Sequence, residues 1–564
     1  MGASRSSRAS RSFETLAVLV LLAALSLAAI AFFYQRGYLL YYGDAEAHLN
    51  IARRILDSRT PGYKQIGTVW LPLPHALMLP LVRIDRLWQT GLAGAIPSGV
   101  CFVLAGTFLF AAAHRAFQSR AAALTAVCLL ALNPNLLYLQ STAMTEPISL
   151  AALAALLYFT VRFRESQSLG WVAGAGVSAL AATLTRYEGW FLIPFVTLYF
   201  LLAARRRRVV AAGLFGAVAS LGPLYWLGHN WWFYGNFLEF YNGPYSARAI
   251  YQRALDSGMA RYPGDHDWSK AWLHYRAAAG LCAGAALVWL GVAGAVVGLV
   301  RRTFWPLALL ALPPVFYLWS MHSAGTPIFV PHLWPHSYYN TRYGLAALPL
   351  LAFAAAALVA VAPARLRALA ALAIIGAGVA GWVAYPRSEA WICWKESQVN
   401  SEGRRAWTRE AAEFLRVHYR PGEGVMTSFG DLTGIFREAG IPLRAMLHEG
   451  NEPHWPAAVA RPDLFLRERW AVTISGDKIA TAILRSQRSG PRYDCVKMIT
   501  IKGAPVIEIY RRTGVMPQSQ VGQLRDPGWD MPPGLSGRFS ETGRDKAGAL
   551  SYEAPPEAEA SGTR

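Results

Sequence analysis

Two acids and a histidine stand close together in YYGDAEAHLNIARR, residues 41–54, directly after the first long apolar run of the chain. A carboxylate at such a position can take the proton of an attacking hydroxyl group. His48 follows Asp44 by four residues, so both lie on one face of a helix, whereas Glu46 points elsewhere. Asp44, which follows Gly43, is equally well placed as the N-cap of that helix. The stretch itself leaves catalysis and capping open.

Two arginines stand where apolar runs begin or end on the side of the membrane that we predict to be the outer one. Arg186 lies in TLTRYEGWF and Arg342 in NTRYGLAALPLLA. A charge beside lipid costs of order 1–3 kcal/mol, depending on its depth. An ion pair with Glu188 would offset much of this cost for Arg186, and such a pair is the structural alternative to a function. Together with Asp44, and with Glu146 in STAMTEPISL, these arginines come from distant parts of the chain to one membrane depth.

A ring of acids and arginines at one membrane depth suits the transfer of a group from a phosphate carrier. The carboxylate removes a proton from the acceptor, and arginine holds the departing phosphate by paired hydrogen bonds. Because phosphate is a good leaving group, the second acid of a glycoside hydrolase is unnecessary. If the carrier is a polyprenyl lipid, its tail stays in the bilayer while its headgroup reacts at the surface, and a site at that depth meets both needs.

The elements that must position these residues are predominantly membrane helices. Hydrophobic residues make up 54% of the 564 positions and charged residues 16%, which is typical of a membrane protein. A helix needs about 20 apolar residues to cross the bilayer. We predict about eleven spans, near residues 14–33, 91–113, 121–139, 147–163, 169–186, 189–204, 209–228, 277–300, 303–320, 344–361 and 366–385.

Clusters of arginine set the predicted orientation. With the N-terminus inside, every inner loop is basic, as the positive-inside rule requires. These loops include the run Arg205 to Arg208 and the pair Arg301 and Arg302. The net charge of +20 therefore reflects topology, and we predict no nucleic-acid partner. An odd number of spans leaves the C-terminal region outside the cytoplasm.

We predict three parts along the chain. Residues 1–390 form the transmembrane domain, whose outer loop 34–90 contains an amphipathic helix near 45–57. Residues 391–512 form a small extracytoplasmic α/β domain, with strands at VMTSF, WAVTIS, YDCVKMI and APVIEIY. Residues 513–564 have the composition of a disordered tail. Cys393 and Cys495 would be free to pair if their region is extracytoplasmic.

The order of these motifs resembles the GT-C superfamily of membrane glycosyltransferases, in the branch of protein mannosyltransferase-like and lipid A aminoarabinose transferase-like proteins. The resemblance rests on GDAEAH at the start of the first outer loop, on TEP and TRYEGW, and on the late TRYGLAALPLLA. It covers roughly residues 10–390. It implies an inverting hexosyl or pentosyl transfer from a polyprenyl-phosphate sugar to a lipid, glycan or protein of the cell envelope, at the outer face of a bacterial cytoplasmic membrane.

The resemblance also implies roles for single residues. Asp44 would be the general base and Glu46 a supporting acid, although the family commonly has two adjacent acids where this chain has Asp-Ala-Glu. A divalent cation, Mg²⁺ or Mn²⁺, at these two acids stays open, and no cofactor is certain. Arg342, Arg186 and Lys64 would hold the donor phosphate. The remaining candidates for substrate binding are His48, His75, Glu146, Tyr187, Glu188 and Tyr343.

A transporter or flippase of a lipid-linked or small anionic substrate is the main alternative. It requires charges near the middle of spans and two related halves of the chain. The sequence shows neither, because its charges gather near one face and we find no internal repeat. A non-catalytic scaffold would need no charged ring at all. We therefore favour the transferase.

Overall fold

The computed structural model describes residues 2–300, 304–323, 325–384 and 390–514. Arg301, Arg302 and residues 515–564 of the predicted tail lie outside the described residues. The chain forms two compact units. The first comprises Met1–Arg53 and Ile66–Glu402, and the second comprises Arg54–Gln65 and Gly403–Arg564. The division thus differs from the predicted domains at two places, because residues 54–65 and 391–402 each belong to the other unit.

The first unit is built from helices. Its N-terminal part contains α1 (Gly2–Gln35), α2 (Gly43–Leu56, which ends in the second unit), α3 (Pro72–Val82), α4 (Asp85–Thr90), α5 (Leu92–Phe117), α6 (Arg120–Ala131), α7 (Pro134–Leu139), α8 (Glu146–Ser166), α9 (Leu169–Thr183), α10 (Glu188–Ala203) and α11 (Arg208–Tyr234). The later part contains α12 (Glu239–Asn242), α13 (Ala247–Asp256), α14 (Trp268–Ala283), α15 (Ala285–Val300), α16 (Phe304–His322), the 3₁₀ turns η2 (Thr341–Ala347) and η3 (Ala364–Leu366), α17 (Leu348–Val361), α18 (Arg367–Ala384) and the start of α19 (Ile392–His418).

The predicted count of eleven spans is not confirmed. Within the described residues, seven helices are long and apolar enough to cross a membrane, or eight if the bent pair α14 and α15 counts as one span. This pair, near the predicted span 277–300, bends by 106°. Three predicted spans instead correspond to the shorter apolar helices α6, α9 and α10. The sequence pattern marks apolar runs, but it does not show where a helix breaks. The protein is a multi-pass membrane protein.

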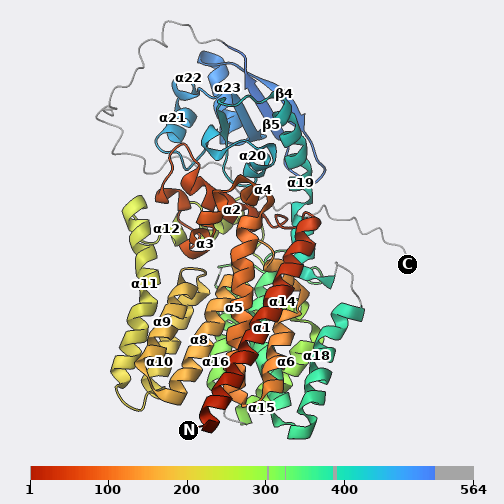
Figure 1. Ribbon diagram of the computed structural model, residues 1–564. Coiled ribbons are helices and arrows are strands. Elements are labelled where there is room, and N and C mark those ends of the chain that lie inside the picture. Colours follow the sequence, from red (N-terminus) through yellow and green to blue (C-terminus); the bar gives the residue numbers. More distant parts are fainter. Residues whose placement is uncertain (1, 301–303, 324, 385–389, 515–564) are drawn as a thin grey trace. The chain divides into compact units, whose positions relative to one another are not determined.

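Small side chains let these helices pack closely. Helix α5 packs against α1, α6 and α8 (Figure 1), and α17 packs against α6 and α15. The run Ala354 to Ala357 of α17 is buried along its whole length. Close packing of small residues brings backbones together, which is how helices associate where lipid removes the hydrophobic driving force. This framework fixes the start of α8 and the junction of α9 and α10, where Glu146, Arg186 and Glu188 lie.

The second unit contains a mixed sheet of five strands, of which the sequence predicted all but β2 (Met446–Leu447). The strands are β1 (Val425–Thr427), β2 (Met446–Leu447), β3 (Trp470–Ile474), β4 (Tyr493–Ile499) and β5 (Ile507–Arg512), in the order β2-β1-β3-β5-β4. Strands β1, β2 and β3 are parallel, and β5 runs antiparallel to β3 and β4. The accompanying helices are the end of α19, α20 (Thr433–Ala439), α21 (His454–Ala460), α22 (Pro462–Phe465) and α23 (Lys478–Ser489), with the turn η5 (Leu443–Ala445).

Residues 54–65 are held in the second unit by polar contacts. The Asp57 carboxylate accepts hydrogen bonds from the Leu443 and Arg444 backbone amides, each at 3.3 Å. Arg59 donates to Glu468 at 2.6 Å. These bonds explain why part of the predicted outer loop belongs to this unit. The five cysteines are free, including the buried Cys393 and the exposed Cys495.

Candidate active site

Asp44 lies in the first turn of α2. This helix begins at Gly43, so Asp44 is inside the helix and is not its cap. An acid in the first turn is favoured there by the helix dipole. The Asp44 side chain is 43% exposed, and its Oδ2 accepts a hydrogen bond from Nη2 of Arg342. Asp44 therefore combines an accessible carboxylate with a fixed cationic partner.

Arg342 is the centre of the site. It lies in η2, where Gly344 allows a close approach to α14, because a Cβ at Gly344 would overlap the Ala278 backbone. The guanidinium is 7% exposed and also donates from Nε to Glu146 Oε1 and from Nη1 to Glu396 Oε1, each at 3.2 Å. A buried arginine is tolerated only when its donors are paired. Three carboxylates from α2, α8 and α19 meet this requirement.

Arg186 forms a second centre at the junction of α9 and α10. Gly189 lets the start of α10 pack against the end of α9, because a Cβ there would overlap the Ala182 backbone. Arg186 donates to Glu188 at 2.6 Å and to Glu146 Oε1 at 3.1 Å. It also donates to the Tyr317 hydroxyl at 2.6 Å, and that hydroxyl donates to Glu188 at 2.8 Å. The predicted pair of Arg186 and Glu188 thus exists, but it is one part of a larger network.

We call the six connected charged residues the charge cluster. They are Asp44, Glu146, Arg186, Glu188, Arg342 and Glu396. Tyr343 lies between the two guanidinium groups, with each Cζ atom 5.0 Å from its ring centroid. Its ring stacks on Tyr317 at a centroid distance of 4.7 Å. Aromatic faces attract cations, so Tyr343 holds two like charges near one another.

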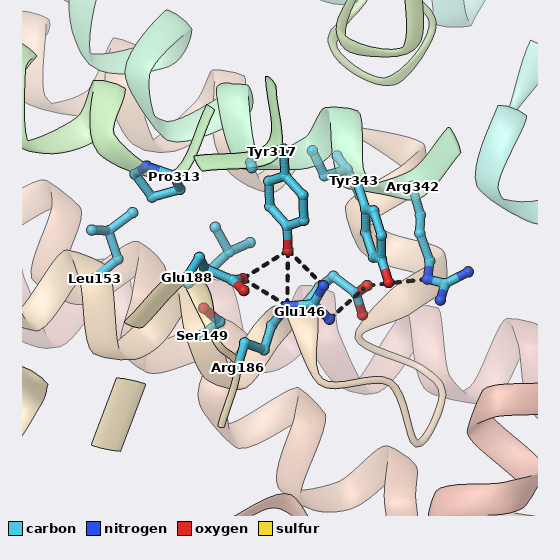
Figure 2. A pocket seen from close by; sticks show the side chains of 12 residues that line it. Glu146, Ser149, Leu153, Arg186, Glu188, Pro313, Tyr317, Arg342 and Tyr343 are labelled. Atoms are coloured by element: carbon cyan, nitrogen blue, oxygen red, sulfur yellow. Dashed lines mark hydrogen bonds and ion pairs between the residues drawn. The ribbon is translucent and has the colours of Figure 1, made fainter. Parts of the chain in front are cut away.

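A narrow pocket opens beside this network (Figure 2). Its polar side is formed by Glu146, Ser149, Arg186, Glu188, Tyr317, Arg342 and Tyr343. Its apolar side is formed by Leu150, Leu153, Pro313, Leu345 and Ala346. In Figure 2, Leu153 and Pro313 lie at one end and Arg342 at the other. The lining of the pocket is therefore charged at one end and apolar at the other.

His48, His75 and Tyr187 belong to a neighbouring hydrogen-bonded group. His48 Nδ1 and His75 Nε2 are 3.0 Å apart, and the His48 ring lies 4.2 Å from that of Trp70. The Tyr187 hydroxyl donates to the Val69 carbonyl at 2.6 Å. Burial, and then the charges of Arg186 and Arg342, lower the pKa of His48 to about 3. These side chains hold the segment around Trp70 in place and keep a neutral histidine near the arginines.

Two predicted residues, Glu46 and Lys64, are not members of the charge cluster. Glu46 is buried in α2, at 5% exposure, two positions after Asp44. Lys64 belongs to the second unit, where its ammonium group lies 2.6 Å from Glu452 Oε2. The structure therefore brings together Asp44, Glu146, Arg186, Glu188, Arg342 and Tyr343 from the predicted set, and it places Lys64 in a different ion pair.

Glu396 and Tyr317 were not identified from the sequence. Glu396 lies in α19 and accepts a second bond, from the Arg342 backbone amide at 3.3 Å. Burial raises the pKa of Glu396, and the nearby Arg342 opposes this shift. Tyr317 lies within an apolar run of α16, where a tyrosine looks like a membrane anchor. A lone acid in WICWKES, just after the last apolar run, is the only signal that could have identified Glu396.

The acids do not form a ready metal site. Among the described residues, no group of three or more histidine, cysteine, aspartate or glutamate side chains is arranged to hold an ion. Asp44, one of the two predicted ligands, is already bonded to the cationic Arg342. The donors around Asp44 thus fit a guanidinium group better than a divalent cation.

The site combines an accessible carboxylate, two buried arginines and an amphipathic pocket at the ends of membrane helices. Chemically, such an arrangement suits the binding of an anionic group by the arginines and the acceptance of a proton by the carboxylate. Residues 87–229 match the family model described as dolichyl-phosphate-mannose-protein mannosyltransferase. None of the curated proteins matches the chain significantly.

Solved structures extend this similarity to the fold. The crystal structure of ArnT from Cupriavidus metallidurans bound to undecaprenyl phosphate has 12% sequence identity and a TM-score of 0.53, covering 87% of this chain and 97% of that one. Its apo form has 13% identity with the same TM-score and coverage. The apo oligosaccharyltransferase of Archaeoglobus fulgidus has 14% identity and a TM-score of 0.45, covering 82% and 69%. The chain thus has the fold of ArnT, and the family model over residues 87–229 agrees with the predicted resemblance to the GT-C superfamily.

Proposed function

We propose that the protein is an inverting glycosyltransferase that moves a sugar from a polyprenyl-phosphate carrier to a cell-envelope acceptor. The observation that carries the proposal is the joining of Asp44 to Arg342, and of Arg342 to Arg186 through Glu146, beside an amphipathic pocket. The family model, and the undecaprenyl phosphate bound to ArnT, support a polyprenyl-phosphate donor. The reaction would take place at the outer face of a bacterial cytoplasmic membrane, with the C-terminal unit outside.

The two arginines are the proposed ligands of the donor phosphate. Both line the polar side of the pocket, and their paired N–H donors match phosphate oxygens. The apolar side, with Leu153 and Pro313, would receive the first isoprene units of the carrier. Lys64 is not included in this role, because its ammonium group pairs with Glu452.

Asp44 is the proposed general base. It is the most exposed carboxylate of the charge cluster, at 43%, whereas Glu146, Glu188 and Glu396 are 8%, 9% and 2% exposed. Asp44 would take the proton of an acceptor hydroxyl while the oxygen of that hydroxyl forms a bond to the anomeric carbon of the sugar. The bond from that carbon to the phosphate oxygen breaks in the same step, and the carrier leaves as polyprenyl phosphate. The arginines stabilise the charge on this leaving group.

The test is transfer of labelled sugar from polyprenyl-linked donors to envelope acceptors by the purified protein. We expect Asp44→Asn to insert and fold normally but to lose about 10²-fold or more of its rate, because a positioned base contributes about 10² to 10⁴. Asp256→Asn is the matched control, since Asp256 is exposed at the end of α13. Transfer by Asp44→Asn at the wild-type rate would remove Asp44 from the mechanism.

A further inference from the structure

Glu146 occupies the space between the two arginines. One oxygen, Oε1, accepts from Arg186 Nη1 at 3.1 Å and from Arg342 Nε at 3.2 Å. The other oxygen, Oε2, is buried and has no hydrogen-bond partner among the described residues. A single carboxylate oxygen thus joins two guanidinium groups, in the manner in which an oxygen of a bound phosphate would.

The charge cluster contains more acids than arginines, and this excess affects the binding of a phosphate. Four carboxylates contact two guanidinium groups in the described part of the chain. A phosphate that enters the pocket meets arginine donors already engaged by acids, and like charges repel strongly where water is excluded. The arginines can hold a phosphate between them only if one of these acids gives up its place.

We infer that Glu146 is an internal substitute for the donor phosphate, and that binding of the donor displaces its carboxylate from between Arg186 and Arg342. This inference rests on the proposed function and concerns the regulation of the same site. Glu146 lowers the affinity for the phosphate group before and after transfer, so it also favours release of polyprenyl phosphate. It keeps the arginines paired whenever no lipid phosphate is bound.

Glu188 provides a comparison within the same site. It is also the first residue of its helix and is similarly buried. Its Oε1 accepts from Arg186 Nε at 2.6 Å and from the Tyr317 hydroxyl at 2.8 Å, so it engages one arginine and one tyrosine. Glu188 is placed as a lasting counter-ion for Arg186, whereas Glu146 stands in the position that joins both arginines.

The experiment measures binding of undecaprenyl phosphate to the purified full-length protein in lipid nanodiscs. We expect Glu146→Gln and Glu146→Ala to bind about tenfold more tightly than wild type, because the competing charge is gone. Glu165→Gln is the matched control, because Glu165 lies at the other end of the same helix and pairs with Arg115, and it should change the affinity less than threefold. Two substitutions at Glu146 are used because either alone could fail to fold, and thermal melting identifies the folded variants.

The outcomes separate this inference from the proposed function. Unchanged or weaker binding by a folded Glu146 variant, with binding that still depends on Arg342, would show that Glu146 is only a structural counter-ion. Binding that Arg342→Gln leaves unchanged in the wild-type background would contradict the proposed phosphate site itself, and the role of Glu146 with it.

Discussion

The charge cluster of the first unit and the ion pairs of the second unit use the same residue types in different surroundings. Arg342 and Glu396 are 7% and 2% exposed, whereas Lys64 and Glu452 are 45% and 56% exposed. An exposed pair contributes about 0–1 kcal/mol, but a buried charge is expensive unless every donor is satisfied. A protein that only needed stability would gain little from a buried cluster. The difference supports the proposal that the chemistry takes place in the first unit.

Removal of Arg342 should have the largest effect on the free energy of unfolding. Arg342→Gln leaves Asp44, Glu146 and Glu396 without their shared partner, so we expect the free energy of unfolding to fall by about 3–5 kcal/mol. Chemical unfolding in detergent measures it. Arg444→Gln is the control, because Arg444 is 67% exposed although it pairs with the buried Asp57. Equal losses in both variants would contradict the distinction between the two regions.

The second-largest effect is expected on acidification, which should lower the stability of the protein through the buried His48. Burial lowers the pKa of His48 to about 3, whereas an unfolded histidine titrates near 6.5. Between about pH 3 and pH 6.5, His48 is protonated in the unfolded chain but stays neutral in the folded protein. The free energy of unfolding therefore declines as the pH falls through this window, and His48 has no effect on it at higher pH. We expect a slope of up to about 1.4 kcal/mol per pH unit.

Melting temperatures at pH 7.5 and 5 would show this effect of His48. His48→Gln should reduce the difference between the two temperatures, because the group that resists protonation is absent. If the variant and the wild type lose the same stability on acidification, other groups carry the acid sensitivity.

The smallest effect is expected at Lys64. Lys64→Gln removes an exposed pair with Glu452, and we expect a loss of about 0.2–1 kcal/mol in unfolding free energy. Binding of undecaprenyl phosphate by the same variant distinguishes a structural role of Lys64 from a role in binding phosphate. A large loss of binding would support the sequence-based prediction that Lys64 holds the donor phosphate.

Local patterns determined much of this protein. Apolar runs predicted a polytopic membrane protein, and short apolar stretches after residue 424 predicted every strand of the second unit except β2. Asp44, Arg186 and Arg342 were conspicuous because a charge beside an apolar run is costly. The order of the surrounding motifs indicated the GT-C resemblance. The helix breaks within α14–α15 and the short lengths of α6, α9 and α10 were not visible in these runs.

Only the tertiary structure decided which charges meet. Arg342 is separated from Asp44 by 298 residues and from Glu146 by 196, so no local pattern could assign these partners. Packing placed Glu396 and Tyr317 in the network, although one follows the last apolar run and the other lies inside an apolar helix. The same packing sent Lys64 to Glu452. The local sequence shows where a charge is costly, but the packing of the helices determines which partner offsets this cost.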